Sequence, residues 1–227
     1  MFKKILTSLS LLFLLSQVNV TAQIKINEYS ASNLSSFTDN FGSTEDFVEL
    51  YNTSATPINL TGYHLSDKAT NLTKWTFGNV TINGNSFLRI WCSGKGSPAD
   101  AVGHLHTNFK LTQCNGDWII LKNGGTIVDS LRLRRTQATH SRGRKPDGSS
   151  TWNIFTSPTP NASNTSTGYA AYAPTPVMNT PPGFYSGTKL VSLSVTPSNS
   201  LTMYYTTDGS EPTTGSSMYV STPVSIS

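Results

Sequence analysis

The sequence predicts an all-β protein built as an antiparallel sandwich or barrel. Apolar and polar residues alternate with a period of two along much of the chain, whereas helical periodicity is nearly absent. Turn-forming clusters of Gly, Asn and Pro separate these stretches, and no crossover helix lies between them. Charged residues make up only 12% of the chain. This composition is typical of extracellular β-structure with many turns and not of a helical enzyme.

The first element, residues 1–22, is expected to be a secretory signal peptide. Lys3 and Lys4 give it a basic start, an apolar run follows as far as Leu15, and small residues lead to a cleavage position near Ala22. The run is too short to cross a bilayer as a helix, and no other segment is apolar enough to do so. We therefore expect an exported protein, either secreted or held at the cell surface.

Export also changes the charge of the mature chain. Removing two of the 16 basic residues, Lys3 and Lys4, leaves 14 against 12 acidic ones. A charge so close to balance does not by itself indicate a polyanionic partner.

Four stretches predict strands of a first domain, which we place at residues 23–164. Each alternates apolar with polar residues; they are 46–52, 86–91, 117–123 and 126–134. Asn123-Gly124-Gly125 joins the last two and predicts a tight hairpin. Asn83-Gly84 predicts a second turn, just before the stretch 86–91.

The chain has two cysteines, Cys92 and Cys114. In an oxidising compartment an even pair predicts one disulfide, and two separate buried thiols are the alternative. No further Cys and no dense His cluster accompanies them, so we expect no structural metal.

A change of composition near residue 157 predicts a domain boundary. Residues 157–176 hold four prolines and many small polar residues, and we expect a linker at 165–173. Alternation then resumes, with Val191, Leu193 and Val195 on one face of a strand. This pattern predicts a second β-domain at 174–227.

The first domain resembles the lamin tail domain, an immunoglobulin-like β-sandwich. Four passages carry the resemblance in the family's order: "IKINEYSAS" (24–32), "DFVELYNTSATPINLTGYHLSD" (46–67), "HTNFKLTQCNGDWIILKNGGTIVDSL" (106–131) and "SRGRKPDGSSTWNIFTSPTPNASN" (141–164). The family's ending has Gly after Thr-Pro, where this chain has Asn161. Asn tolerates left-handed backbone angles, so the same turn is expected. The resemblance implies an accessory module of secreted bacterial proteins, found beside hydrolases, nucleases or kinase-like domains, and it brings no catalytic residue.

The second domain is similar to the small β-sandwich at the C-terminus of chitobiase and β-hexosaminidase. The matching passages are "GFYSGTKLVSLSV", "MYYTTDGSEPT" and "SSMYVSTPVSI". This resemblance implies another non-catalytic appendage. The family pattern continues with a further strand pair, so we expect an incomplete sandwich and further domains of the same protein downstream.

The segment 131–148 is the most basic of the chain and the best candidate for binding. Its candidate contacts to a polyanion are Arg132, Arg134, Arg135, Arg142 and Lys145. The alternative is structural: a solvated strand face, with Arg144 in an internal ion pair to an acid such as Glu49. No aromatic residue interleaves the arginines, which disfavours nucleic acid and leaves a cell-surface polymer or polysaccharide as the expected partner.

Other candidate chemistry is weak. His104 and His106 form a His-x-His pair but lack further ligands, and Glu49 is expected to be a surface charge or part of an ion pair. No nucleophile motif and no phosphate loop is present, so we expect no catalytic residue and no cofactor. The predicted function is a non-catalytic accessory, adhesion or spacer module at the cell surface. The alternatives are the accessory region of a secreted enzyme whose catalytic domain lies downstream, and a weak polysaccharide- or DNA-binding module.

Overall fold

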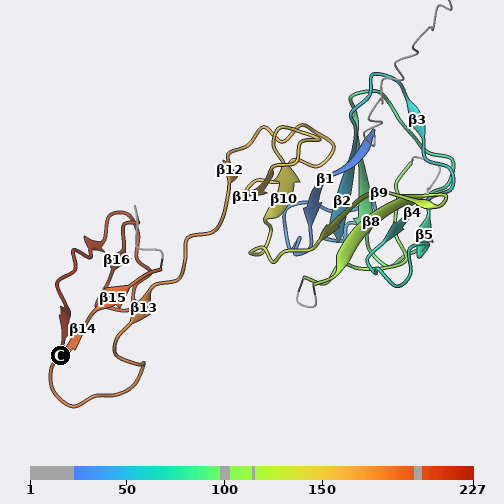
Figure 1. Ribbon diagram of the computed structural model, residues 1–227. Coiled ribbons are helices and arrows are strands. Elements are labelled where there is room, and N and C mark those ends of the chain that lie inside the picture. The colour runs from blue at the N-terminus through green and yellow to red at the C-terminus, as the bar shows by residue number, and fades with distance from the viewer. Residues whose placement is uncertain (1–22, 98–102, 114–115, 197–200) are drawn as a thin grey trace, which may run out of the picture. The chain divides into compact units, whose positions relative to one another are not determined.

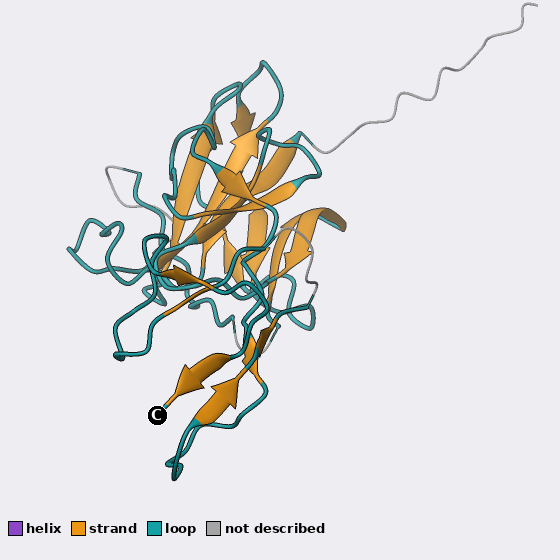
Figure 2. Ribbon diagram, turned by 90° about the vertical axis from the view of Figure 1, so that its left-hand side faces the viewer, coloured by secondary structure: helices purple, strands orange, loops and turns teal. Residues whose placement is uncertain are grey.

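The computed structural model describes residues 23–97, 103–113, 116–196 and 201–227. The predicted signal peptide and Cys114 lie outside these residues. The chain divides into a first compact unit that ends at Ala170 and a second unit, Ala171–Ser227 (Figure 1). The described residues form strands and loops and no helix (Figure 2), so none of them provides a helix able to cross a membrane.

Two antiparallel sheets make up most of the first unit. The larger sheet has the strand order β12-β11-β10-β1-β2-β7, and the smaller has the order β5-β4-β8-β9. The strands of the larger sheet are β1 (Ile24–Ser30), β2 (Asp46–Asn52), β7 (Phe87–Cys92), β10 (Ser141–Arg144), β11 (Trp152–Phe155) and β12 (Gly168–Tyr169). Those of the smaller are β4 (Tyr63–Ser66), β5 (Trp75–Thr76), β8 (Trp118–Asn123) and β9 (Thr126–Arg132), and β3 (Ile58–Asn59) pairs separately with β6 (Thr81–Ile82).

The hydrophobic core joins the two sheets. Strands of both contribute fully buried side chains, among them Ile26, Leu50 and Ile90 from the larger sheet and Leu65 and Leu121 from the smaller. Burying each such side chain contributes roughly 1.5–3 kcal/mol. Two layered sheets of antiparallel strands around one core confirm the predicted immunoglobulin-like sandwich.

The four strands predicted from alternation in the first domain are confirmed, each within two residues of its predicted ends. The hairpin of β8 and β9 is also confirmed, because Asn123 pairs with Thr126 across Gly124, whose φ is +52°. The turn at Asn83-Gly84 forms too, but β6 pairs with β3 while β7 pairs with β2. A Cβ on Gly84 would lie 2.2 Å from the carbonyl oxygen of Ala55, so this turn requires glycine.

The segment expected as a linker, 165–173, is partly ordered against the first unit. Strand β12 within it pairs with β11. Lys145 Nζ donates to the carbonyl oxygens of Thr165 at 3.2 Å and Ser166 at 2.7 Å. The pairing of β12 with β11 and the bonds from Lys145 hold this segment to the first unit. The first unit therefore extends to Ala170, although the composition of the segment predicts a linker.

The second unit consists of short paired strands. They form three pairs, β13 (Val177–Met178) with β15 (Leu193–Ser194), β14 (Lys189–Val191) with β18 (Val224–Ile226), and β16 (Tyr204–Tyr205) with β17 (Ser217–Met218). The strand predicted through Val191, Leu193 and Val195 is wrong as a single element, because the chain there divides into two short strands with different partners and Val195 lies outside both. A turn forms at Asp208-Gly209, with the Asp208 carboxylate accepting from the Ser210 amide at 3.0 Å. None of the described residues of this unit is buried, and Phe184 is fully exposed. The predicted buried face is therefore only half-buried.

Residues 171–227 alone are expected to show no cooperative unfolding transition. A domain without buried apolar side chains cannot offset the entropy of ordering its chain. Circular dichroism of this fragment during a urea titration should drift without a sigmoidal step. A cooperative step of normal steepness would show that the unit holds a core of its own.

Candidate functional site: an arginine-lined groove

Strand β10 supplies the residues that organise the candidate site. It pairs with β1 on one side and β11 on the other, with Arg142 opposite Tyr29 and Ile154. Alternate side chains of a strand point to opposite faces, so Ser141 and Gly143 share one face and Arg142 and Arg144 share the other.

Arg144 is a structural residue that completes the fold. Its guanidinium donates to the carbonyl oxygen of Ile26 at 2.7 Å and pairs with the Asp129 carboxylate at 3.0 Å. It also lies 4.8 Å from the ring centre of Trp152. The expected internal ion pair of Arg144 is therefore confirmed, but its acid is Asp129 and not Glu49. Glu49 lies two strands away on β2 and faces the opposite side of the sheet.

Arg142 is almost as buried as Arg144 but differs in its contacts. Its exposed fraction is 9%, and among the described residues it has no hydrogen bond and no ion pair through its side chain. It lines a groove of about 350 Å³. The other lining residues are Tyr29, Leu131, Arg132, Arg134, Ser150, Trp152 and Ala170.

Contacts within the fold fix the walls of this groove. The Tyr29 hydroxyl accepts from the backbone amide of Arg134 at 3.1 Å, and the Tyr29 ring packs against Trp152 with centroids 5.8 Å apart. Arg132 Nε donates to the carbonyl oxygen of Gly116 at 3.1 Å. These bonds restrain the backbone of Arg134 and the guanidinium of Arg132.

The structure thus brings together three of the five cations predicted to contact a polyanion. Arg132, Arg134 and Arg142 line the groove, whereas Arg135 is exposed and is not among the lining residues. Lys145 instead bonds backbone carbonyls of the segment expected as a linker. The basic segment itself does not indicate the two aromatic residues of the groove, because they reach it from distant strands.

On the other face of β10, two fully buried carboxylates hold the end of the first unit. Glu28 accepts from Ser141 Oγ at 2.5 Å and from the Thr159 amide at 3.1 Å. Glu49 accepts from Asn27 Nδ2 at 3.0 Å and from the Asn161 amide at 2.5 Å. The φ of Asn161 is +63°, which confirms the expected left-handed turn.

The environment of these carboxylates is strongly desolvated. Burial raises the pKa of Glu28 to about 7, and burial together with the charge of Glu28 raises the pKa of Glu49 to about 8. The expectation that Glu49 is a surface charge or part of an ion pair is wrong. The loop that follows residue 157 covers the face of the sheet on which it lies.

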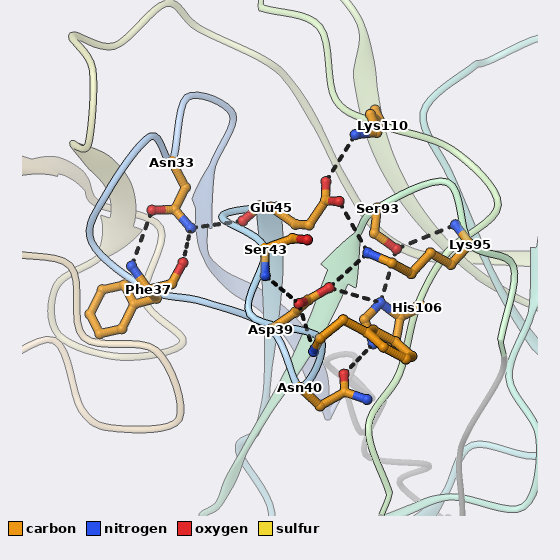
Figure 3. A network of polar contacts seen from close by, with 11 residues as sticks. Asn33, Phe37, Asp39, Asn40, Ser43, Glu45, Ser93, Lys95, His106 and Lys110 are labelled. Carbon is orange, nitrogen blue, oxygen red and sulfur yellow. Dashed lines mark hydrogen bonds and ion pairs between the residues drawn. The ribbon is translucent and has the colours of Figure 1, made fainter.

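A second polar network ties the loop before β2 to the end of β7 (Figure 3). Ser93 Oγ lies 2.9 Å from His106 Nδ1, and His106 Nε2 lies 2.7 Å from Asn40 Oδ1. Lys95 bridges the carboxylates of Asp39 and Glu45 at 2.8 Å and 3.1 Å.

The Ser93–His106–Asn40 contacts do not make a nucleophilic site. Ser93 and His106 are 5% and 1% exposed, so a substrate could not reach them. Both ring nitrogens of His106 are engaged in hydrogen bonds, so it could not act as a metal ligand with His104. The network stabilises the loops that it joins.

The predicted disulfide between Cys92 and Cys114 remains a prediction. Cys92 is fully buried at the end of β7 and has no disulfide partner among the described residues, and Cys114 lies outside them. We expect intact mass spectrometry of exported, unreduced protein to show no alkylation, and two alkyl groups after reduction and unfolding. Alkylation of both thiols on unfolding without reductant would contradict the bridge.

Comparison with known proteins gives two family matches. The model of the Lamin Tail Domain matches residues 17–134, and the model of the Chitobiase/beta-hexosaminidase C-terminal domain matches residues 180–227. Both resemblances are thus confirmed, in their predicted order. The first match ends before β10, whereas the structure continues the same sheet through β10, β11 and β12. No curated protein matches the chain.

Proposed function

The chain belongs to the lamin tail domain family, and we propose that it is an exported, non-catalytic accessory module that spaces or anchors partner domains at the cell surface. Both matched families are non-catalytic β-sandwich modules. The basic, apolar and small-residue pattern of residues 1–22 supports export.

The observation that carries this proposal is that the side chains best suited to acid–base chemistry are buried within the fold. The carboxylates with the largest upward pKa shifts, Glu28 and Glu49, are fully buried and accept hydrogen bonds from a loop of the first unit. Ser93 and His106 are buried as well. The arginine-lined groove contains no carboxylate, histidine or cysteine among its lining residues, so it offers no general base that would activate the hydroxyl of Ser150.

Processing of the N-terminus tests the proposed export. Expression of the full chain in a bacterial host should give protein outside the cytoplasm whose first residue is close to Gln23. An unprocessed chain that begins at Met1 and stays in the cytoplasm would contradict the proposal.

A second candidate is the accessory region of a secreted hydrolase, nuclease or kinase-like enzyme. The exposure of apolar side chains in the second unit favours it, because Val177, Leu190 and Val220 are each more than 60% exposed. Such side chains are usually covered by further strands or a partner domain. The gene sequence beyond codon 227 tests this candidate, and a stop codon directly after Ser227 would remove it.

The partner class that we propose is a cell-surface polysaccharide. The second matched family is named for chitobiase and β-hexosaminidase, and the groove offers three cations to an acidic polymer. Nucleic acid is disfavoured because the aromatic rings at the groove pack against protein groups.

A further inference from the structure

We propose that the groove beside Arg142 binds the acidic group, a carboxylate or a sulfate, of a sugar unit in an anionic polysaccharide. The inference rests on one part of the proposed function, the export of the chain, because such polymers lie outside the cytoplasm. Arg142 is the residue at the centre of the site.

Arg142 lies mostly within the fold, but its guanidinium has no hydrogen-bond or ion-pair partner among the described residues and its nitrogens still reach solvent. A guanidinium in such a place is stabilised by an anion that bonds to it. Arg144, on the same face of the same strand, is compensated by the Ile26 carbonyl and by Asp129. Arg142 has no such contact among the described residues, and it lines the groove. An anion bound in the groove would give Arg142 the hydrogen bonds and the opposite charge that the Ile26 carbonyl and Asp129 give to Arg144.

The charges around the groove favour an anion. Arg132 and Arg134 line it, and none of the lining residues is acidic. Asp129, on strand β9 beside the groove, is already occupied by Arg144 and by the amide of Ile26 at 2.9 Å. Guanidinium groups match the planar carboxylate and the oxygens of sulfate through paired hydrogen bonds.

The walls are rigid enough to hold a defined ligand. The Tyr29 hydroxyl is fixed to the Arg134 backbone, and Trp152 is held between Tyr29 and Arg144. A site whose side chains are already restrained loses less entropy on binding. Ser150 also lines the groove.

The same walls favour a sugar over a nucleic acid. Tyr29 is 1% exposed and offers no free face to a base, and the Arg144 guanidinium lies over the ring of Trp152. A groove of about 350 Å³ lies at the small end of ligand pockets and suits one sugar unit. Nucleic acid binding draws its affinity from several phosphates at once.

The test is calorimetric titration of the purified chain with four probes at low and at high salt. The probes are a sulfated disaccharide, a galacturonate trimer, an N-acetylglucosamine trimer and a single-stranded oligonucleotide. We expect weak, salt-sensitive binding of an acidic saccharide, with the sulfated and uronate arms showing which acid is preferred. The neutral trimer should not bind. Saturable binding of the oligonucleotide alone, or of none of the probes, would overturn the inference.

Two matched variants locate the site. Arg142→Gln should weaken binding of the acidic saccharide at least about tenfold, because it removes the central charged hydrogen bonds. Arg135→Gln removes an equal charge a short distance along the chain and outside the groove, and should change the affinity less than about twofold. Equal losses in both variants would mean diffuse attraction and would contradict a defined site. If processing at Ala22 is correct but no saccharide binds, the groove inference fails while the proposed function stands.

Discussion

Replacing Arg144 with methionine is expected to lower the free energy of unfolding by about 3 kcal/mol, because it leaves the carboxylate of Asp129 buried without its partner. The Asp129 and Arg144 side chains are 12% and 11% exposed, so water cannot replace the lost contact well. The variant also removes the donor to the Ile26 carbonyl and the guanidinium packed on Trp152. Urea denaturation followed by tryptophan fluorescence measures the loss.

Arg142→Met is the matched control for this variant. It lies two residues away on the same face of β10 and has a similar exposed fraction, 9% for each arginine. Methionine keeps most of the apolar stem, and the charge that it removes has no partner among the described residues. We expect a change within about 1 kcal/mol of the original protein. Equal destabilisation by the two variants would show that Arg142, too, serves the fold.

The second large effect is a loss of stability as the pH rises from about 5 to about 8. The pKa values of Glu28 and Glu49 rise from the ordinary 4.5 to about 7 and about 8 in the folded chain because of burial. Between these values the folded state keeps protons that the unfolded state has released. The stability that these groups contribute is therefore complete below pH 4.5 and is lost as the pH rises through their folded values.

The other shifted carboxyl groups do not reverse this trend. Burial raises the pKa of Asp46 to about 6, which acts in the same direction. Asp39 differs, because hydrogen bonds from Lys95 and from backbone amides outweigh its burial and lower its pKa below 3.8. Its contribution is lost only as the pH falls through that lower range, which lies below the window in which Glu28 and Glu49 titrate.

Urea denaturation at several pH values measures the slope. Each proton that the folded state holds in excess changes the free energy of unfolding by roughly 1.4 kcal/mol per pH unit. Glu49→Gln, which resembles the protonated acid in size and charge, should flatten the slope by up to one such proton. Glu211→Gln at an exposed turn should leave it unchanged. A wild-type protein that gains stability between pH 5 and pH 8 would contradict the account.

The period-two pattern predicted the strands because alternation is local. Strand β2 has the predicted bounds, and Glu49 lies on the face opposite Val48 and Leu50, as its pattern indicates. The pattern could not show that a loop more than 100 residues away covers this face, through the Asn161 amide. Glu49, which the alternation assigns to the solvent face of its strand, is therefore fully buried in the fold.

The candidate site was predicted in the same partial way. Three of the residues that the density of basic residues indicates, Arg132, Arg134 and Arg142, line one groove. Arg144 forms an ion pair and Arg142 does not, and this difference depends on where Asp129 lies on strand β9. The positions of Tyr29 and Trp152 depend on the pairing of β1, β10 and β11. Long-range pairing of this kind sets the site, and local sequence does not encode it.

The central claim is that the basic segment contains one defined anion site at Arg142, and not a diffuse charged surface. Chemical-shift mapping with a sulfated disaccharide tests it most directly. The account predicts that the largest shifts fall on the Trp152 indole and on the amides of Tyr29, Arg142 and Ser150, with Arg135 little changed. Shifts spread evenly over Arg132, Arg134, Arg135 and Lys145, with Trp152 unmoved, would contradict it.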